Sequence, residues 1–90
     1  MENSKQFVNA TLVVKKLKST PNNEQLCSLY GLFKQATIGN NTTTKPSMFD
    51  FKANSKWNAW MSYKDTSTYD AEVKYITLVN LLISQCGITA

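Results

Sequence analysis

Neither histidine nor arginine occurs among the 90 residues of this chain, which carries ten lysines and six acidic residues. Without histidine, the chain lacks the commonest general base and the commonest metal ligand of proteins. Without arginine, every cationic contact must come from the compact ammonium group of a lysine. The two cysteines, Cys27 and Cys86, cannot form a zinc site alone. We therefore expect no enzymatic activity, no metal site and no cofactor.

Long hydrophobic runs and targeting segments are also missing. No apolar run approaches the ~20 residues of a membrane-spanning helix, and no segment resembles a signal peptide. We expect a cytoplasmic protein in a reducing setting, where a disulfide between Cys27 and Cys86 is not favoured. The net charge of +4 is compatible with nucleic acid, anionic lipid or a phosphorylated small molecule, and does not choose among them.

The composition, 42% hydrophobic and 18% charged, is typical of a globular protein. Apolar residues recur with helical spacing in four segments, which predicts an all-α four-helix bundle formed by a single domain, residues 1–90. Asn22 and Gln25 have the spacing of a capping box at the start of the second segment. The polar segment 40–48 is predicted to be an ordered, functional loop. The predicted helices span about residues 5–18, 22–38, 53–64 and 68–85.

The second of these helices contains the stretch around which the chain is organised. Tyr30 and Lys34 are four residues apart and neighbour each other on one face, where an aromatic ring and an ammonium group suit a ligand with a ring and a phosphate. Taken alone, these residues favour a simpler interpretation, a core helix with both side chains at its edge. Gly31 is compatible with close packing or with a close ligand. The adjoining apolar face is formed by Leu26, Leu29, Phe33 and Ala36.

Residues 30–39 read Tyr-Gly-Leu-Phe-Lys-Gln-Ala-Thr-Ile-Gly and resemble the motif Tyr-x-x-[Tyr/Phe]-Lys-Gln-Ala-Thr-x-Gly of the acyl-CoA-binding protein family. The resemblance continues in register over about residues 7–82 and includes Lys56-Trp57-x-x-Trp60. It implies that family's up-down-down-up bundle, in which a shallow bowl between the helices receives the ligand. It also implies that the two tryptophans are chiefly structural.

By the same resemblance, we expect non-enzymatic binding and intracellular transport and buffering of long-chain fatty acyl-CoA esters, one per monomer. The sequence departs from the family at Thr11, where a small alanine is frequent, and Phe33 keeps the aromatic ring without a hydroxyl group. Leu29 and Met48 are candidates for the acyl tail. The positions that match are Tyr30, Lys34 and Lys56 around the ribose 3′-phosphate, Phe33, Tyr75 and Lys15 around the adenine, and Lys52 as a further cationic contact.

Two other classes of function remain open on the residues themselves. A basic, aromatic-rich helical module could bind nucleic acid, although the lysines are spread over several helices and no recognition motif appears. A protein-interaction domain could retain the fold without binding acyl-CoA, although every expected lysine and tyrosine is present. We favour acyl-CoA as the ligand over both alternatives, nucleic acid and a protein partner.

The end of the fourth helix departs from the family because residues 76–86 contain no charge. Leu81 falls on one flank of the apolar stripe expected to face the core, and Ile76 and Ile83 fall on the other, so the apolar arc of the helix is wide. The stripe is formed by Tyr75, Leu78, Val79, Leu82 and Cys86. Wider burial against the first two helices is the favoured explanation. The alternative is an apolar patch for transient membrane contact or, since no positive charge accompanies it, for weak self-association of an otherwise monomeric protein.

Overall fold

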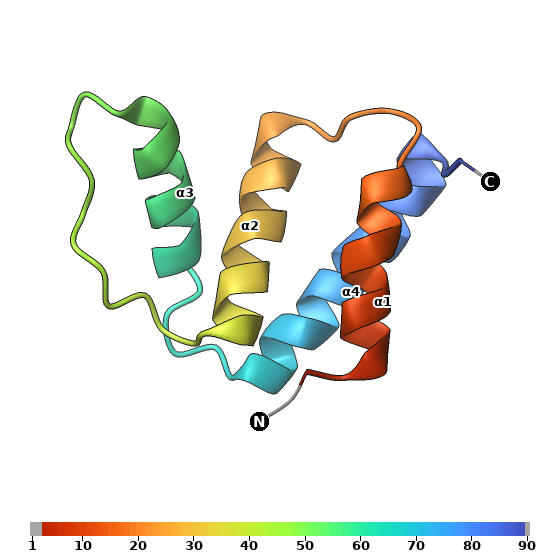
Figure 1. Ribbon diagram of the computed structural model, residues 1–90, viewed down its shortest axis with the longest axis horizontal. Helices are drawn as coiled ribbons and strands as arrows, with labels where there is room; N and C mark the ends of the chain where they lie inside the picture. The colour runs from red at the N-terminus through yellow and green to blue at the C-terminus, as the bar shows by residue number, and fades with distance from the viewer. Residues whose placement is uncertain (1–2, 90) are drawn as a thin grey trace.

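Two antiparallel pairs of directions define the arrangement of the helices: the outer two in the sequence run one way and the middle two the other. The computed structural model describes residues 3–89. Figure 1 shows that the first and last helices run upward and the two middle helices downward, which is the up-down-down-up order expected from the family resemblance. None of the helices within residues 3–89 has the length and apolar character needed to cross a membrane. The elements are α1 (Lys5–Val13), the 3₁₀ turn η1 (Val14–Lys16), α2 (Asn23–Thr37), α3 (Phe51–Met61) and α4 (Thr68–Cys86).

The first helix is shorter than the predicted 5–18, because the chain after Lys16 pairs with the C-terminal segment instead of continuing the helix. The backbone N–H of Lys18 donates to the carbonyl oxygen of Gly87 (2.9 Å), and that of Thr89 donates to the carbonyl of Lys16 (2.9 Å). These bonds require the extended backbone found at Leu17. Lys15, Lys16 and Lys18 therefore lie beyond the end of the α-helix, although the predicted bounds placed them in its last turn.

The third helix begins two residues before the predicted 53–64 and ends three residues earlier. The Asp50 carboxylate accepts the backbone N–H of Ala53 (3.0 Å) and fixes the start of α3 at Phe51. The helix ends at Met61, and the following turn contains Asp65 with a positive φ of 69°. The second helix carries the predicted capping box, with Asn22 and Gln25 bonded reciprocally.

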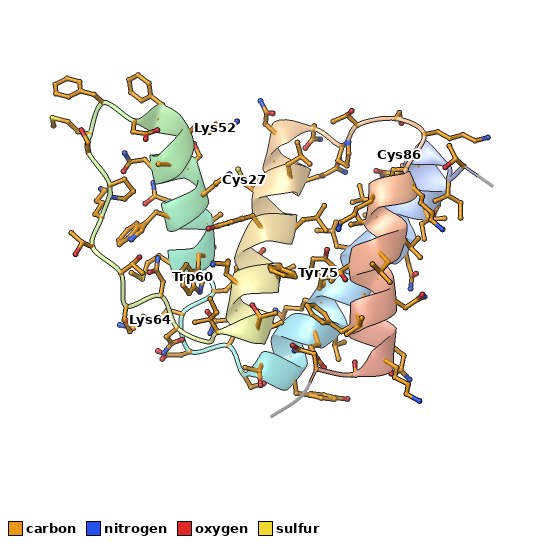
Figure 2. The ribbon with its side chains drawn as sticks, viewed as in Figure 1. Cys27, Lys52, Trp60, Lys64, Tyr75 and Cys86 are labelled. Carbon is orange, nitrogen blue, oxygen red and sulfur yellow. The ribbon has the colours of Figure 1, made fainter. Side chains whose placement is uncertain are left out.

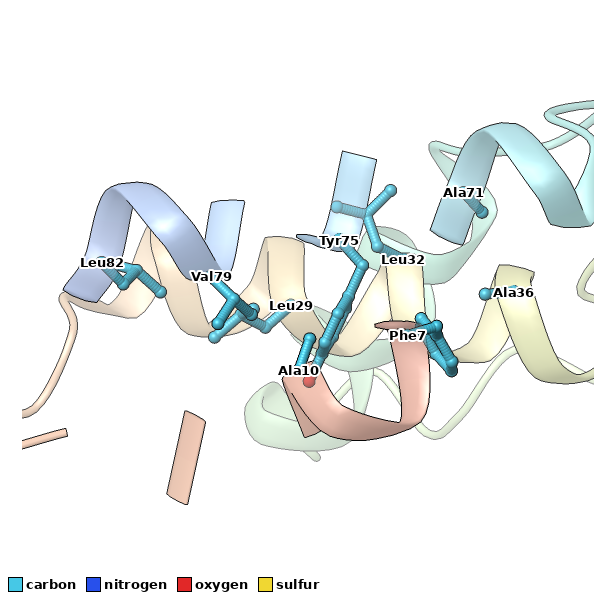
Figure 3. Close-up of a cluster of buried hydrophobic side chains, with 9 residues drawn as sticks. All are labelled: Phe7, Ala10, Leu29, Leu32, Ala36, Ala71, Tyr75, Val79 and Leu82. Atoms are coloured by element: carbon cyan, nitrogen blue, oxygen red, sulfur yellow. The ribbon is translucent and has the colours of Figure 1, made fainter. Parts of the chain in front are cut away.

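The hydrophobic core lies among α1, α2 and α4, and α3 packs against α2 alone among the described helices. Figure 3 shows the core side chains meeting around Tyr75, with Phe7 of α1 beside it. Helices α1 and α2 are not packed backbone to backbone, so aromatic side chains fill the space between them. The buried core residues are Phe7, Ala10, Leu29, Leu32, Ala36, Ala71, Tyr75, Val79 and Leu82.

The long connection between α2 and α3, residues 38–50, is held by the two tryptophans of α3. The indole N–H of Trp60 donates to the carbonyl oxygen of Gly39 (2.7 Å), and that of Trp57 donates to the carbonyl of Thr43 (3.2 Å). Asn41 is buried and donates through its side chain to the backbone of Trp57 (3.4 Å). The two tryptophans therefore fix this loop along the outer face of α3.

Candidate functional site

Tyr30, half-buried in the middle of α2, lines three adjoining hollows of about 420, 280 and 350 Å³. We call them the lysine hollow, the aromatic hollow and the tryptophan hollow. The first and third lie between α2 and α3, and the second lies between α2, α4 and the end of α1. Because one side chain borders all three, a ligand extended across Tyr30 can occupy them together.

The lysine hollow is bordered by basic and apolar groups. Lys52 and Lys56 both line it, as their four-residue spacing predicts. Figure 2 shows Lys52 at the start of α3 and Cys27 on the facing side of α2. Cys27 and Cys86 are free thiols. The remaining lining residues are Asn23, Leu26, Tyr30 and Ser55.

Two ammonium groups flank the Tyr30 ring. Lys34 Nζ lies 6.0 Å from the ring centroid, and Lys56 Nζ, from the neighbouring helix, lies 5.5 Å from it. Lys34 Nζ is also 5.0 Å from the Trp60 ring. The aromatic faces stabilise both cations without neutralising them. The site therefore presents two positive charges around one phenol group, which suits a doubly charged phosphate.

Three aromatic rings form the base of the site between α1, α2 and α4. The Phe7 and Tyr75 centroids are 5.0 Å apart in an edge-on arrangement, and Phe33 lies 6.0 Å from Phe7 and 6.3 Å from Tyr75. Phe33 and Tyr75 line the aromatic hollow, where Phe33 keeps 38% of its surface exposed. Burial raises the pKa of the Tyr75 phenol above its ordinary value. An exposed ring above a buried aromatic pair can stack on a planar ligand.

Lys15 is the predicted site residue with the weakest structural link to the others. It is exposed in η1, next to Val14, which lines the aromatic hollow. Among the described contacts, none joins its ammonium group to Tyr30, Lys34 or Lys56. Of the two tail candidates, Leu29 lines the aromatic hollow, whereas Met48 is exposed on the loop and borders none of the three hollows.

Sequence reasoning missed part of the lining. Asn23 and Cys27 precede Tyr30 by seven and three residues, which places all three on the α2 face that meets α3. That spacing is visible in the sequence, but only the position of α3 shows which face borders a hollow. Thr43 and Pro46 of the loop line the tryptophan hollow and could be placed only by the bonds of the tryptophans. Within residues 3–89, no three His, Cys, Asp or Glu side chains gather to hold a metal ion.

Comparisons with known proteins identify relatives of this chain. A family model described as "Acyl CoA binding protein" matches residues 4–79. "Acyl-CoA-binding protein homolog 1" of Caenorhabditis elegans is 48% identical over 81 residues, covering 90% of this chain and 94% of that relative. "Acyl-CoA-binding protein" of Brassica napus is 50% identical over 70 residues, covering 78% and 76%.

Solved structures resemble the chain in three dimensions as well. The crystal structure of Oryza sativa Acyl-CoA-Binding Protein 2 has a TM-score of 0.86 and 38% identity, covering 90% of each chain. The solution structure of acyl coenzyme A binding protein from yeast has a TM-score of 0.74 and 40% identity, covering 94% of this chain and 99% of that one. The chain belongs to the acyl-CoA-binding protein family.

Proposed function

We propose that the protein binds one long-chain fatty acyl-CoA ester per monomer, and buffers and transports it in the cytoplasm. The observation that carries this proposal is the placement of Lys34, from α2, and Lys56, from α3, within 6.0 Å of the Tyr30 ring centroid. Two ammonium groups and a phenol hydroxyl are suitable donors for the ribose 3′-phosphate of coenzyme A. The family membership of the chain supports the same ligand.

The other parts of such a ligand match the neighbouring hollows. The adenine stacks in the aromatic hollow against Phe33 and Tyr75, and Lys15 directly follows Val14, another lining residue of that hollow. Lys52 provides a further charge for the pyrophosphate. The acyl tail follows the apolar groups between the helices, where removal of each methylene group from water is worth ~0.8 kcal/mol.

We infer that the thioester leaves the protein unchanged. The chain contains no histidine to act as a general base. The charged groups of the site surround an aromatic ring, which suits ligand retention. The geometry also disfavours a nucleic-acid-binding module, since Lys34 and Lys56 border hollows instead of a continuous basic surface.

Calorimetric titration with CoA, palmitoyl-CoA and free palmitate tests the proposal. We expect one palmitoyl-CoA per chain, weaker binding of CoA because it buries no tail, and poor binding of palmitate because it lacks the head group. Equal affinity for palmitate and palmitoyl-CoA would contradict the assignment, since the lysines around Tyr30 would then contribute nothing. Displacement of palmitoyl-CoA by a polynucleotide would favour the nucleic-acid alternative.

A further inference from the structure

The turn before α3 exposes three large apolar side chains within four residues. Met48, Phe49 and Phe51 have exposed fractions of 74%, 81% and 79%, the highest among the exposed large hydrophobic residues of the described chain. We call these three residues the apolar tip. Single exposed apolar residues are ordinary, but a contiguous group marks a surface that meets another phase or molecule.

Hydrogen bonds hold the apolar tip in this exposed position. The backbone N–H of Asp50 donates to the carbonyl oxygen of Ser47 (3.0 Å), and the backbone N–H of Phe49 donates to the Ser47 hydroxyl (3.3 Å). The Asn54 side chain, one turn into α3, also donates to the Ser47 carbonyl (2.6 Å). The exposure of the rings therefore follows from a fixed turn at the start of the helix.

The apolar tip lies on a basic edge of a flattened molecule, whose extents are 40 × 32 × 15 Å. Figure 1 shows that η1 and the starts of α2 and α3 lie along the same upper edge. The N-terminal ends of α2 and α3 add partial positive charge. Only two acidic residues lie on these segments, Glu24 and Asp50, and the latter caps α3. The lysines of the edge are Lys15, Lys16, Lys18 and Lys52, all exposed.

The lysine hollow extends to the same edge, because its lining includes residues at the starts of α2 and α3. Lys52 directly follows Phe51 and lines that hollow together with Asn23, the first residue of α2. A surface that contacts the apolar tip would therefore face the hollow. If that surface were a bilayer, an acyl chain could pass between the two without crossing water.

We propose that the apolar tip docks the protein on anionic membranes, with Phe49 and Phe51 inserted at the boundary of headgroups and acyl chains. The edge lysines then contact lipid phosphates, and the combination of apolar insertion with basic residues is typical of interfacial membrane binding. A second copy fits less well, because two equally basic edges repel each other. A protein groove fits less well too, because the lysines spread along the whole edge favour an extended anionic surface. Docking itself is argued from the exposed rings and the edge lysines. Only its purpose, the passage of acyl chains between bilayer and protein, rests on the proposed function.

Vesicle sedimentation tests the proposal on the full chain, with phosphatidylcholine vesicles compared with vesicles that also contain 30% phosphatidylserine. We expect the wild type to bind the anionic vesicles. Phe49→Ser and Phe51→Ser should each lower the partition coefficient about tenfold, through lost insertion of one ring. Tyr69→Ser is the matched control, because Tyr69 is 70% exposed at the start of α4, on the opposite edge, and its loss should change partitioning less than twofold.

Charge and ligand binding are measured on the same variants. Lys16→Ala and Lys18→Ala should each weaken binding to anionic vesicles about fivefold at low salt, which is the effect of one lysine near such a surface. Palmitoyl-CoA affinity without vesicles should be unchanged in Phe49→Ser. If the wild type does not bind palmitoyl-CoA while its vesicle binding depends on the rings, the proposed function is wrong. The proposal that the apolar tip docks on membranes is then still supported.

Three kinds of result would overturn the proposal that the apolar tip docks on membranes. The first is a wild type that does not sediment with anionic vesicles, or tip variants that sediment equally well. The second is a Phe49→Ser variant that loses palmitoyl-CoA but not CoA affinity, since the tip would then cover the acyl tail. The third is a wild-type dimer in light scattering that the tip substitutions dissociate, since the rings would then bind a second copy.

Discussion

Gly31 of α2 lies directly against the backbone carbonyl of Ala59 in α3. A Cβ atom at position 31 would come within 2.5 Å of the Ala59 oxygen and 2.9 Å of the Tyr63 ring. The absence of a side chain there allows the two helices to approach closely. This approach brings Lys56 of α3 beside Tyr30, the residue before the glycine. Of the two explanations that the sequence leaves open for this glycine, close packing is therefore the one that the structure supports.

We predict that Gly31→Ala destabilises the protein, although alanine gains about 1 kcal/mol in helix propensity. The added methyl group meets rigid backbone, and overpacking of this kind costs about 1–3 kcal/mol or more. Calorimetry should show a lower melting temperature, and titration should show weaker palmitoyl-CoA binding because α3 moves away from Tyr30. Ser84→Ala, at an exposed position of α4, is the control and should not lower the melting temperature. A Gly31→Ala protein as stable as the wild type would contradict the packing explanation.

Lys34→Ala and Lys56→Ala should each weaken palmitoyl-CoA binding by about 1.5–3 kcal/mol, the contribution of a charge-assisted hydrogen bond. Lys16→Ala and Lys18→Ala should change it by less than about 0.5 kcal/mol, because these exposed lysines border none of the three hollows. Titration calorimetry measures all four. Equal losses in the four variants would indicate diffuse charge instead of a phosphate site at Tyr30. A palmitoyl-CoA analogue without the 3′-phosphate should largely remove the difference.

Much of the fold could be predicted because local patterns agree with the tertiary structure. The capping box of Asn22 and Gln25 gave the start of α2 to within a residue, and helical spacing predicted the core stripe of α4. The end of α1 could not be predicted, because it depends on backbone bonds from Lys16 and Lys18 to the far end of the chain. Such pairing has no local pattern in the sequence.

The candidate site divides in the same way. The four-residue spacing of Lys52 and Lys56 predicts that the two side chains share one face of α3, and both line the lysine hollow. That this face meets a ligand was implied only by the family resemblance. The grouping of Lys34 with Lys56 around Tyr30 depends on how closely two helices pack, and only the family resemblance suggested it. The apolar tip could not be predicted, because phenylalanine is a residue type that is usually buried. The exposure of Phe49 and Phe51 follows from the turn at Ser47.

Trp60→Phe should loosen the loop that closes the tryptophan hollow. The variant keeps an aromatic ring in a buried position but loses the bond from the indole N–H to the carbonyl oxygen of Gly39. An unpaired buried polar group costs about 1–3 kcal/mol, so the free energy of unfolding should fall by about that amount. Amide hydrogen exchange should accelerate in residues 39–46 more than in α4. Unchanged exchange in the loop would show that the bond does not hold it.

Tyr75→Phe should make stability less sensitive to alkali. Because burial raises the pKa of Tyr75 in the folded protein, the unfolded chain releases that proton first, near pH 10. The contribution of the neutral phenol is therefore complete below pH 10 and is lost as pH rises through the raised pKa, at up to about 1.4 kcal/mol per pH unit. Denaturant unfolding between pH 8 and 11 should show a shallower decline for Tyr75→Phe. Tyr69→Phe, at an exposed position, should decline as the wild type does.

A lysine introduced at Ile83 should destabilise the protein more than one introduced at Leu81, on the opposite flank of the apolar stripe of α4. Ile83 is half-buried against the core cluster, as is Ile76, whereas Leu81 is 49% exposed. Ile83→Lys must bury an ammonium group or displace packed side chains, so we predict a loss of several kcal/mol in unfolding free energy. Leu81→Lys should cost less than about 1 kcal/mol, as an exposed substitution. Calorimetry measures both, and light scattering at several concentrations measures association.

Because the structure buries one flank, a patch that includes Ile83 is disfavoured. A wild type that dimerises, and that Leu81→Lys returns to a monomer, would instead support self-association through Leu81.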